Sequence, residues 1–125
     1  MRTGGRNGLR RPKLGPRRGD VWWVDLDPVR GHEQGGRRPA LVVSADGFNA
    51  SPFRLVVICP ITRTELGSSM HVFVAPPEGG LRARSFVMCE QVRCISVDRL
   101  GSRLGEATAW TVAAVLARLQ RLVDL

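Results

Sequence analysis

Residues 30–39 read RGHEQGGRRP and put side chains that could do chemistry on a flexible turn. The segment lies between two apolar, strand-like runs, 21–26 and 40–44. Its glycines let the backbone turn, and a simple connection between strands needs little more than that. The imidazole, carboxylate, amide and three guanidiniums are groups suited to binding and cleaving a phosphodiester. The segment is therefore the first candidate site.

Other chemistries have less support. The two histidines, His32 and His71, are 39 positions apart, and no cysteine pair has the spacing of zinc ligands. The sequence has neither a glycine-rich phosphate loop leading into a helix nor a serine nucleophile elbow. Arginines, carboxylates, one histidine and a threonine remain, and these suffice to cleave RNA without a metal ion. A base removes the 2′-hydroxyl proton, a cation stabilises the phosphorane, and an acid protonates the leaving oxygen. We expect no cofactor.

The length of 125 residues predicts one domain with a modest core. No apolar run approaches the roughly 20 residues that span a bilayer, and the basic start lacks the apolar segment of a secretory signal. The three cysteines, Cys59, Cys89 and Cys94, are an odd number without close pairing. We expect reduced, core-filling thiols in a cytoplasmic protein.

The net charge of +8 is concentrated at the start of the chain. Residues 1–18 hold seven basic and no acidic side chains, which leaves 12 basic and 11 acidic residues for the remainder. A segment rich in Gly, Pro and Arg cannot support a core, so we expect a disordered basic tail at 1–17 and one domain at 18–125. The tail is a solvated extension, the product of a start codon placed too far upstream, or an arm that attracts phosphates by counterion release.

Alternation in 21–26 predicts a strand with Trp22, Val24 and Leu26 facing the core. Trp23 then faces outward, and we expect another molecule to bury its ring. A partner protomer in a dimer is favoured for this role, and a stacked nucleobase is the alternative.

Short apolar runs separated by turn residues predict a small, strongly bent antiparallel sheet or barrel. The further strands expected are 40–44, 55–59, 71–75, 86–89, 92–96 and 103–106. Residues 108–123 lack Gly and Pro and repeat apolar side chains at helical spacing, so they predict one amphipathic helix with Thr108 as its N-cap.

From residue 18 onward the chain resembles the MazF/PemK-type toxins, including the Kid toxin, of bacterial toxin–antitoxin pairs. The resemblance rests on segments in the family's order: GDVWWVDLDP at 19–28, GHEQGGRRPALVVS at 31–44, CPIT at 59–62 and SFVMCEQVRCI at 85–95. The block G-x-E-Q-x-x-x-R-P, followed by P-x-T and an acid-Gln-Val-Arg segment, is the most specific part.

The resemblance implies an SH3-like, CcdB-like twisted antiparallel β barrel with a C-terminal helix, assembled as a homodimer. It implies a sequence-specific endoribonuclease that cuts single-stranded RNA, with mRNA as the expected target, without a metal ion. The products would carry a 2′,3′-cyclic phosphate and a 5′-hydroxyl. A cognate MazE-like antitoxin would inhibit the enzyme by laying an acidic segment over the RNA groove.

Two residues match the family's motif closely. Arg38 matches the arginine before proline and would stabilise charge on the scissile phosphate with its rigid fork of donors. Thr62 matches the threonine of P-x-T and would hold a phosphate oxygen. By residue type alone, Arg38 could instead pair with Glu33 or Glu90, and Thr62 could cap a loop. The motif favours the catalytic roles.

Proton transfer has two candidates. Glu90 matches the acid implicated as the base in Kid-like members, and His32 matches a histidine there, with a pKa suited to proton transfer near neutral pH. Kid-like members carry a functional arginine where this chain has Met88. Another cation must supply that charge, with Arg38 the first choice and Arg93 the next.

The remaining RNA contacts are expected from residues that flank these positions: Glu33, Gln34, Arg37, Arg63, Gln91 and Arg93. Gln34 reads base edges or orients its loop, and loop orientation is favoured for Gln91. Arg93 contacts phosphate or pairs with a carboxylate. Arg63 replaces a serine common in the family and is expected to change the preferred RNA sequence.

Two other classes of function remain open. Gyrase-poisoning CcdB toxins resemble the expected fold, and a fold does not fix function. The loop arginine and the P-x-T threonine argue against that class, since CcdB-type toxins act through the end of their C-terminal helix. An RNA-binding module with decayed catalysis would rely on the basic tail. Most of the positions expected to react still carry reactive side chains, which argues against this class.

Overall fold

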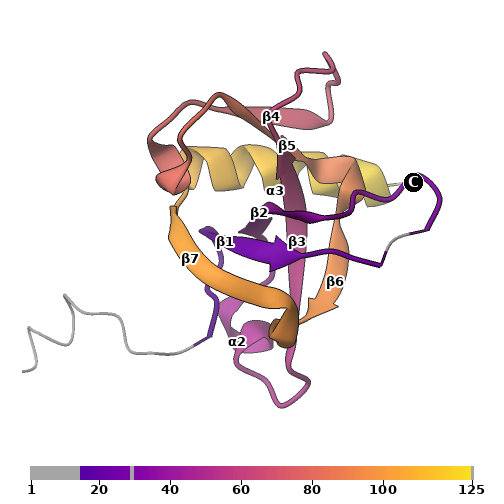
Figure 1. The fold of residues 1–125 in the computed structure, drawn as a ribbon, viewed down its shortest axis with the longest axis vertical. Coiled ribbons are helices and arrows are strands. Elements are labelled where there is room, and N and C mark those ends of the chain that lie inside the picture. Colours follow the sequence, from indigo (N-terminus) through magenta and orange to yellow (C-terminus); the bar gives the residue numbers. More distant parts are fainter. Residues whose placement is uncertain (1–14, 29, 125) are drawn as a thin grey trace, which may run out of the picture.

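The computed structural model describes residues 15–28 and 30–124, and within them the chain forms a mainly β domain with a C-terminal helix (Figure 1). The strands are β1 (Asp20–Asp25), β2 (Arg37–Val42), β3 (Leu55–Thr62), β4 (His71–Val74), β5 (Ser85–Met88), β6 (Arg93–Ser96) and β7 (Leu100–Glu106). The helices are α2 (Asp46–Asn49) and α3 (Ala109–Val123), with 3-10 turns η1 (Glu78–Gly80), η2 (Cys89–Gln91) and η3 (Val97–Arg99).

The sheet is antiparallel and strongly bent, with the strand order β4-β5-β3-β2-β1-β7 and β6 pairing with β3. The predicted mainly β architecture with one C-terminal helix is confirmed. The barrel is not closed within the described residues, because β4 and β7 end the path of paired strands without pairing to each other.

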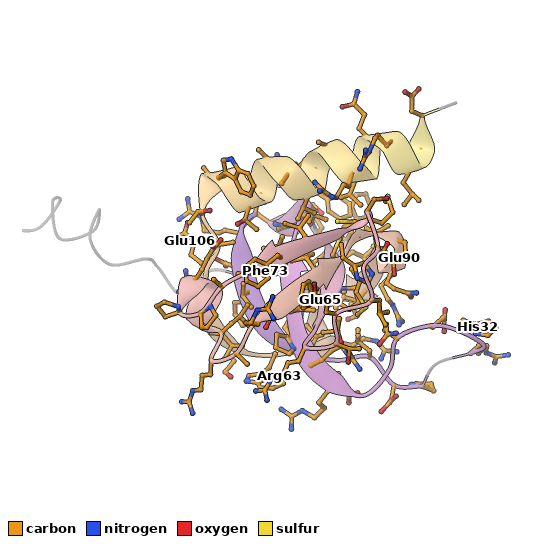
Figure 2. All side chains as sticks on the ribbon, turned by 90° about the horizontal axis from the view of Figure 1, so that it is seen from above. His32, Arg63, Glu65, Phe73, Glu90 and Glu106 are labelled. Atoms are coloured by element: carbon orange, nitrogen blue, oxygen red, sulfur yellow. The ribbon has the colours of Figure 1, made fainter. Side chains whose placement is uncertain are left out.

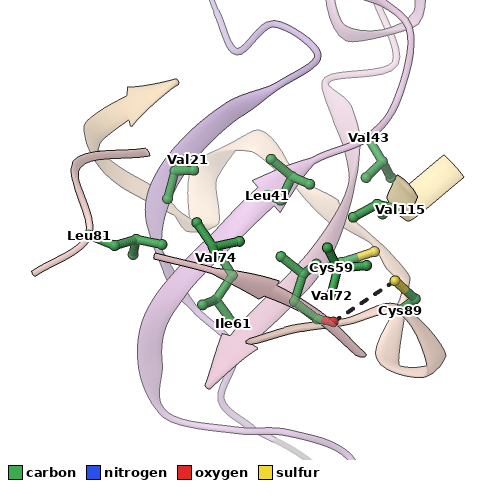
Figure 3. Packing of buried hydrophobic residues seen from close by; sticks show 11 residues of the cluster. Val21, Leu41, Val43, Cys59, Ile61, Val72, Val74, Leu81, Cys89 and Val115 are labelled. Carbon is green, nitrogen blue, oxygen red and sulfur yellow. Dashed lines mark hydrogen bonds between the residues drawn. The ribbon is translucent and has the colours of Figure 1, made fainter. Parts of the chain in front are cut away.

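Two hydrophobic clusters form on opposite faces of the bent sheet. Val21 belongs to the cluster beneath α3, shown in Figure 3, and Val24 belongs to the other. Both are buried because side chains point alternately to the two faces of a strand, and both faces of this sheet are covered. Trp22, predicted as a core residue, is only half-buried at the edge of the second cluster, and its indole Nε1 donates to Asp20 Oδ2 at 3.2 Å.

The cysteines divide between core and surface. All three are free thiols, as predicted, and Cys59 and Cys89 are buried in the first cluster. The prediction that Cys94 fills the core is wrong, because its neighbour Ile95 is the β6 residue that enters the core. Alternation along the strand then turns Cys94 outward.

Most of the predicted tail lies outside the described residues. Residues 15–17 are described, and the backbone N–H of Arg17 donates to Asp20 Oδ2 at 2.9 Å. Within the described part of the chain, no helix combines the length and apolar character needed to cross a membrane.

The start of α3 is held by a carboxylate that the sequence did not indicate. Thr108 Oγ1 accepts from the N–H of Thr111 at 3.2 Å, which confirms the predicted N-cap. Glu78 Oε2 in turn accepts from the N–H of Thr108 at 2.9 Å and from the Thr111 hydroxyl at 2.5 Å. Burial opposes ionisation of Glu78, but the hydrogen bonds from Thr111 and Thr108 outweigh it and lower the pKa of its carboxyl.

Replacing Glu78 with glutamine is expected to lower the free energy of unfolding at neutral pH by about 1–2 kcal/mol, since charged hydrogen bonds at a helix start are lost. Because the pKa of Glu78 is lower in the folded state, its ionised carboxylate stabilises the fold above the usual pKa range of glutamate. That stabilisation is lost as the pH falls through the folded-state pKa. Urea unfolding at several pH values should therefore show the two proteins converging below roughly pH 4. An equal difference at every pH would contradict this account.

Candidate functional site

A cleft of about 610 Å³ opens where the start of β2 meets the end of β3. Its walls come from Trp23 on β1, residues 37–39 on β2, residues 61–63 at the end of β3, residues 80–83, Ser85 and Leu104 on β7. The predicted catalytic pair, Arg38 and Thr62, and the predicted RNA contacts Arg37 and Arg63 therefore share one cavity.

Arg38 lies on a strand and not on the flexible turn that the sequence suggested. The predicted second strand began at residue 40, whereas β2 begins at Arg37 and pairs with β1, with Arg38 opposite Val24. The Nε of Arg38 donates to the carbonyl of Gly35 at 3.1 Å, and Nη1 lies 3.5 Å from the carbonyl of Ile61. These contacts direct the guanidinium to the end of β3.

Thr62 is the last residue of β3 and is half-buried in the cleft wall. Its Oγ1 accepts from the N–H of Thr64 at 3.1 Å. A hydroxyl that accepts from the backbone keeps its own proton available for donation. Thr62 can therefore donate to an anionic oxygen placed in the cleft.

The cleft is electropositive. Four guanidiniums line it, from Arg37, Arg38, Arg63 and Arg82, and among residues 15–28 and 30–124 none of the four forms an ion pair with a carboxylate. The alternative in which Arg38 pairs with an acid is thereby wrong within this part of the chain. Cations concentrated in a concave site raise the local concentration of anions. The arrangement suits a polyanion such as a nucleic acid backbone.

Trp23 is half-buried and forms part of the cleft wall, opposite Pro39 in the β1–β2 pairing. The ring therefore borders the cationic site. Its assignment to a dimer interface stays a prediction.

Glu90 lies outside the cleft lining, in η2 after β5. Its Oε2 is 3.0 Å from Nε2 of the buried His71 on β4, which stands opposite Met88 in the β4–β5 pairing. Gln91 and Arg93, close to Glu90 in the chain, are half-buried. The structure thus separates the predicted acid from the Arg38–Thr62 pair and gives it a histidine partner that the sequence did not single out.

The predicted site loop extends away from these groups. His32 and Glu33 are exposed, and Figure 2 shows His32 at the far end of the loop. Glu33 Oε1 accepts from the backbone N–H of Arg30 at 2.6 Å, so this carboxylate shapes the turn. Gln34 is half-buried at its base. Of the loop's predicted site residues, only the two arginines that begin β2 line the cleft.

Comparison with known proteins identifies the family. The model for the PemK-like, MazF-like toxins of type II toxin–antitoxin systems matches residues 17–123. The chain belongs to this family.

Individual relatives of this MazF-like protein agree with the family match. The chain is 35% identical to endoribonuclease MazF9 of Mycobacterium tuberculosis, over 87% of this chain and 97% of the relative. It is 37% identical to endoribonuclease PemK of Escherichia coli, over 92% of this chain and 87% of the relative.

Solved structures support the same fold. MazF from Deinococcus radiodurans superposes with a TM-score of 0.81 at 32% identity, covering 90% of this chain and all of that one (100%). A mycobacterial endoribonuclease in complex with its cognate antitoxin superposes with a TM-score of 0.73 at 27% identity, covering 89% and 97% of the two chains. The family predicted from the sequence motifs is confirmed.

This MazF-like chain also has basic residues at the cleft that the sequence reasoning missed. Arg82 lines the cleft from the segment between η1 and β5, and Arg84 follows two residues later. The signal was the run GLRARSF at 80–86, in which two arginines directly precede a strand. Both lie between the quoted family motifs.

Proposed function

We propose that this MazF-like protein is a sequence-specific endoribonuclease toxin that cleaves single-stranded RNA, with mRNA as its target, and is neutralised by a cognate antitoxin. The observation that carries the proposal is the cleft in which Arg38 and Thr62 lie together with arginines that lack acidic partners among the described residues. The names of its relatives, endoribonucleases MazF9 and PemK, and the structure of a similar enzyme with its antitoxin support it.

In the proposed reaction the RNA backbone lies in the cleft with its scissile phosphate between Arg38 and Thr62. A base takes the proton of the preceding ribose's 2′-hydroxyl as this oxygen attacks phosphorus, and an acid protonates the 5′-oxygen of the next nucleotide as its bond to phosphorus breaks. The products carry a 2′,3′-cyclic phosphate and a 5′-hydroxyl. Arg38 and Thr62 donate to the non-bridging oxygens as negative charge develops there. Because the nucleophile belongs to the substrate, the reaction needs no metal ion.

Glu90 is the first candidate for proton transfer and His32 the second. The contact with His71 at 3.0 Å fixes the orientation of the Glu90 carboxylate. Glu90 does not line the cleft, so the RNA would have to extend from Thr62 across β5 towards η2 for this carboxylate to reach a ribose. Gln91 and Arg93 would contact the RNA on the same path.

Replacing Glu90 with glutamine is expected to reduce the rate constant for RNA cleavage by about 10²–10⁴-fold, the usual contribution of a general base or acid. Affinity for an uncleavable 2′-deoxy analogue should change little, because the isosteric amide preserves the shape of the side chain. Single-turnover kinetics with a short RNA measure the rate. The matched control is Glu106→Gln, at the end of β7, whose carboxylate lies 4.0 Å from Arg103. Equal rates for wild type and Glu90→Gln would remove Glu90 from the mechanism.

We propose that the antitoxin places acidic side chains on the same arginines that bind RNA, so that RNA and antitoxin exclude each other.

The toxin would act in the cytoplasm as a homodimer. A second copy would cover part of Trp23 and complete the groove that begins at the cleft.

Expression in bacteria tests the function against the gyrase-poison alternative. We expect growth arrest accompanied by fragmentation of transcripts, with both effects absent for a folded Thr62→Val variant. Growth arrest with intact transcripts and trapped gyrase–DNA complexes would contradict the proposal.

A further inference from the structure

A row of side chains crosses the sheet from Thr62 to the edge strand β4. Thr62 stands opposite Phe86 on β5, and Phe86 stands opposite Phe73 on β4. Directly opposed residues of antiparallel strands project from the same face, so both rings share the face of Thr62. Phe86 is buried, whereas Phe73 is 46% exposed. The row therefore leads from the candidate scissile-phosphate site to an exposed aromatic ring.

Arg84 covers this ring with a flat, charged group. Its guanidinium carbon lies 5.0 Å from the centre of the Phe73 ring and 6.0 Å from that of Phe86. Arg84 Nη2 is 3.6 Å from Glu65 Oε1, which restrains the guanidinium over the ring, yet its side chain remains 66% exposed. Figure 2 shows Phe73 and Glu65 near each other.

The Arg84–Phe73 pair lies next to the cleft, because the residues before and after Arg84 in the chain line it. Ala83 and Ser85, on either side of Arg84, both line the cleft. An RNA strand whose phosphate contacts Thr62 can therefore place a neighbouring base over Arg84. Exposed guanidinium planes and aromatic rings are the surfaces on which unpaired RNA bases stack.

We propose that Arg84 and Phe73 form a stacking platform for the nucleobase next to the scissile phosphate, a proposal that rests on the endoribonuclease function above. The base stacks on the outer plane of Arg84, which Phe73 supports from beneath. The positive charge of Arg84 also attracts the adjacent phosphate. The platform helps to set which nucleotide is accepted beside the cut.

Binding of modified RNA tests the platform. The probe is an oligoribonucleotide that contains the enzyme's own mapped cleavage site, with a 2′-deoxyribose at the cut so that it stays intact. Each base around the cut is removed in turn to leave an abasic nucleotide. For the wild type, one abasic position should weaken binding about tenfold, as expected from loss of one stacked base.

Variants locate that effect on the protein. Phe73→Ala and Arg84→Ala should bind the complete RNA about tenfold more weakly and lose the dependence on that one base. Arg84→Lys keeps the charge without the plane, so it should lose the dependence on that base as the alanine variant does. The matched control is Phe53→Ala, since Phe53 is 69% exposed and its ring centre lies 6.2 Å from that of Phe48. Phe53 precedes β3 and lies outside the cleft lining. This variant should bind like the wild type.

An unchanged abasic dependence in both Phe73→Ala and Arg84→Ala would overturn the platform while leaving the endoribonuclease function intact. The same conclusion follows if these variants dissociate a dimer without altering the base dependence, because the face would then be a protein contact. A wild type that leaves RNA uncut would overturn the proposed function and the platform with it. Thermal unfolding of each variant confirms that it is folded.

Discussion

Arg38→Ala is expected to reduce the rate constant for RNA cleavage by about 10²–10³-fold, the usual effect of removing one donor from the developing oxyanion. Arg38→Lys should recover only part of that loss, because an ammonium lacks the planar fork of donors. Stability should fall by only about 1 kcal/mol, through loss of the hydrogen bond to the Gly35 carbonyl. Single-turnover cleavage of a short RNA and urea unfolding measure the two effects.

The control for Arg38 is Arg54→Ala. Arg54 is exposed, pairs with Asp98 at 2.8 Å and lies outside the cleft lining, so its loss should leave cleavage unchanged. If Arg38→Ala cleaves RNA at the wild-type rate, the cleft is not the active site. If Arg54→Ala is as slow as Arg38→Ala, the effect reflects overall charge.

Gly80→Ala is expected to lower the free energy of unfolding by about 3–5 kcal/mol, near the upper end for single substitutions. A Cβ at this position would lie 2.1 Å from the carbonyl oxygen of Leu104, and the backbone φ is +72°. The η1 turn packs against β7 here, so the clash cannot be relieved by moving a side chain. Because Gly80 and Leu104 both line the cleft, the surviving folded protein should also cleave RNA more slowly.

The matched control is Gly67→Ala. Gly67 has nearly the same backbone φ, +69°, but among the described residues nothing lies within 4 Å of the place that a Cβ would occupy. Only the conformational strain of roughly 1–2 kcal/mol should remain. Urea unfolding of both variants separates strain from steric overlap, and equal losses of stability would show that the close approach to β7 is unimportant.

Local patterns predicted the parts of the fold that depend on a few neighbouring residues. The alternation from Val21 to Leu26 predicted β1, and the Gly- and Pro-free run after Thr108 predicted α3 and its cap. The same alternation misjudged the burial of Trp22, because periodicity cannot show that this residue lies at the edge of its cluster, where its indole Nε1 donates to Asp20.

The site was only partly predictable for a similar reason. The motif residues Arg38 and Thr62 lie together, as the family resemblance implied, because β2 and β3 pair antiparallel with Ala40 opposite Pro60. The contact between Glu90 and His71 depends on the register of β4 against β5, which no local pattern reveals. The Arg84–Phe73 contact depends on the same register.

Mapping the ends of RNA fragments tests the central claim most directly. The purified protein would be incubated with a long unstructured RNA in the presence of EDTA, and both ends of every fragment would be identified. We predict cuts at one short sequence, with 2′,3′-cyclic phosphate and 5′-hydroxyl ends and rates unaffected by EDTA. Uncut RNA, 5′-phosphate ends or activity abolished by EDTA would contradict the proposed metal-independent cleavage in the Arg38–Thr62 cleft.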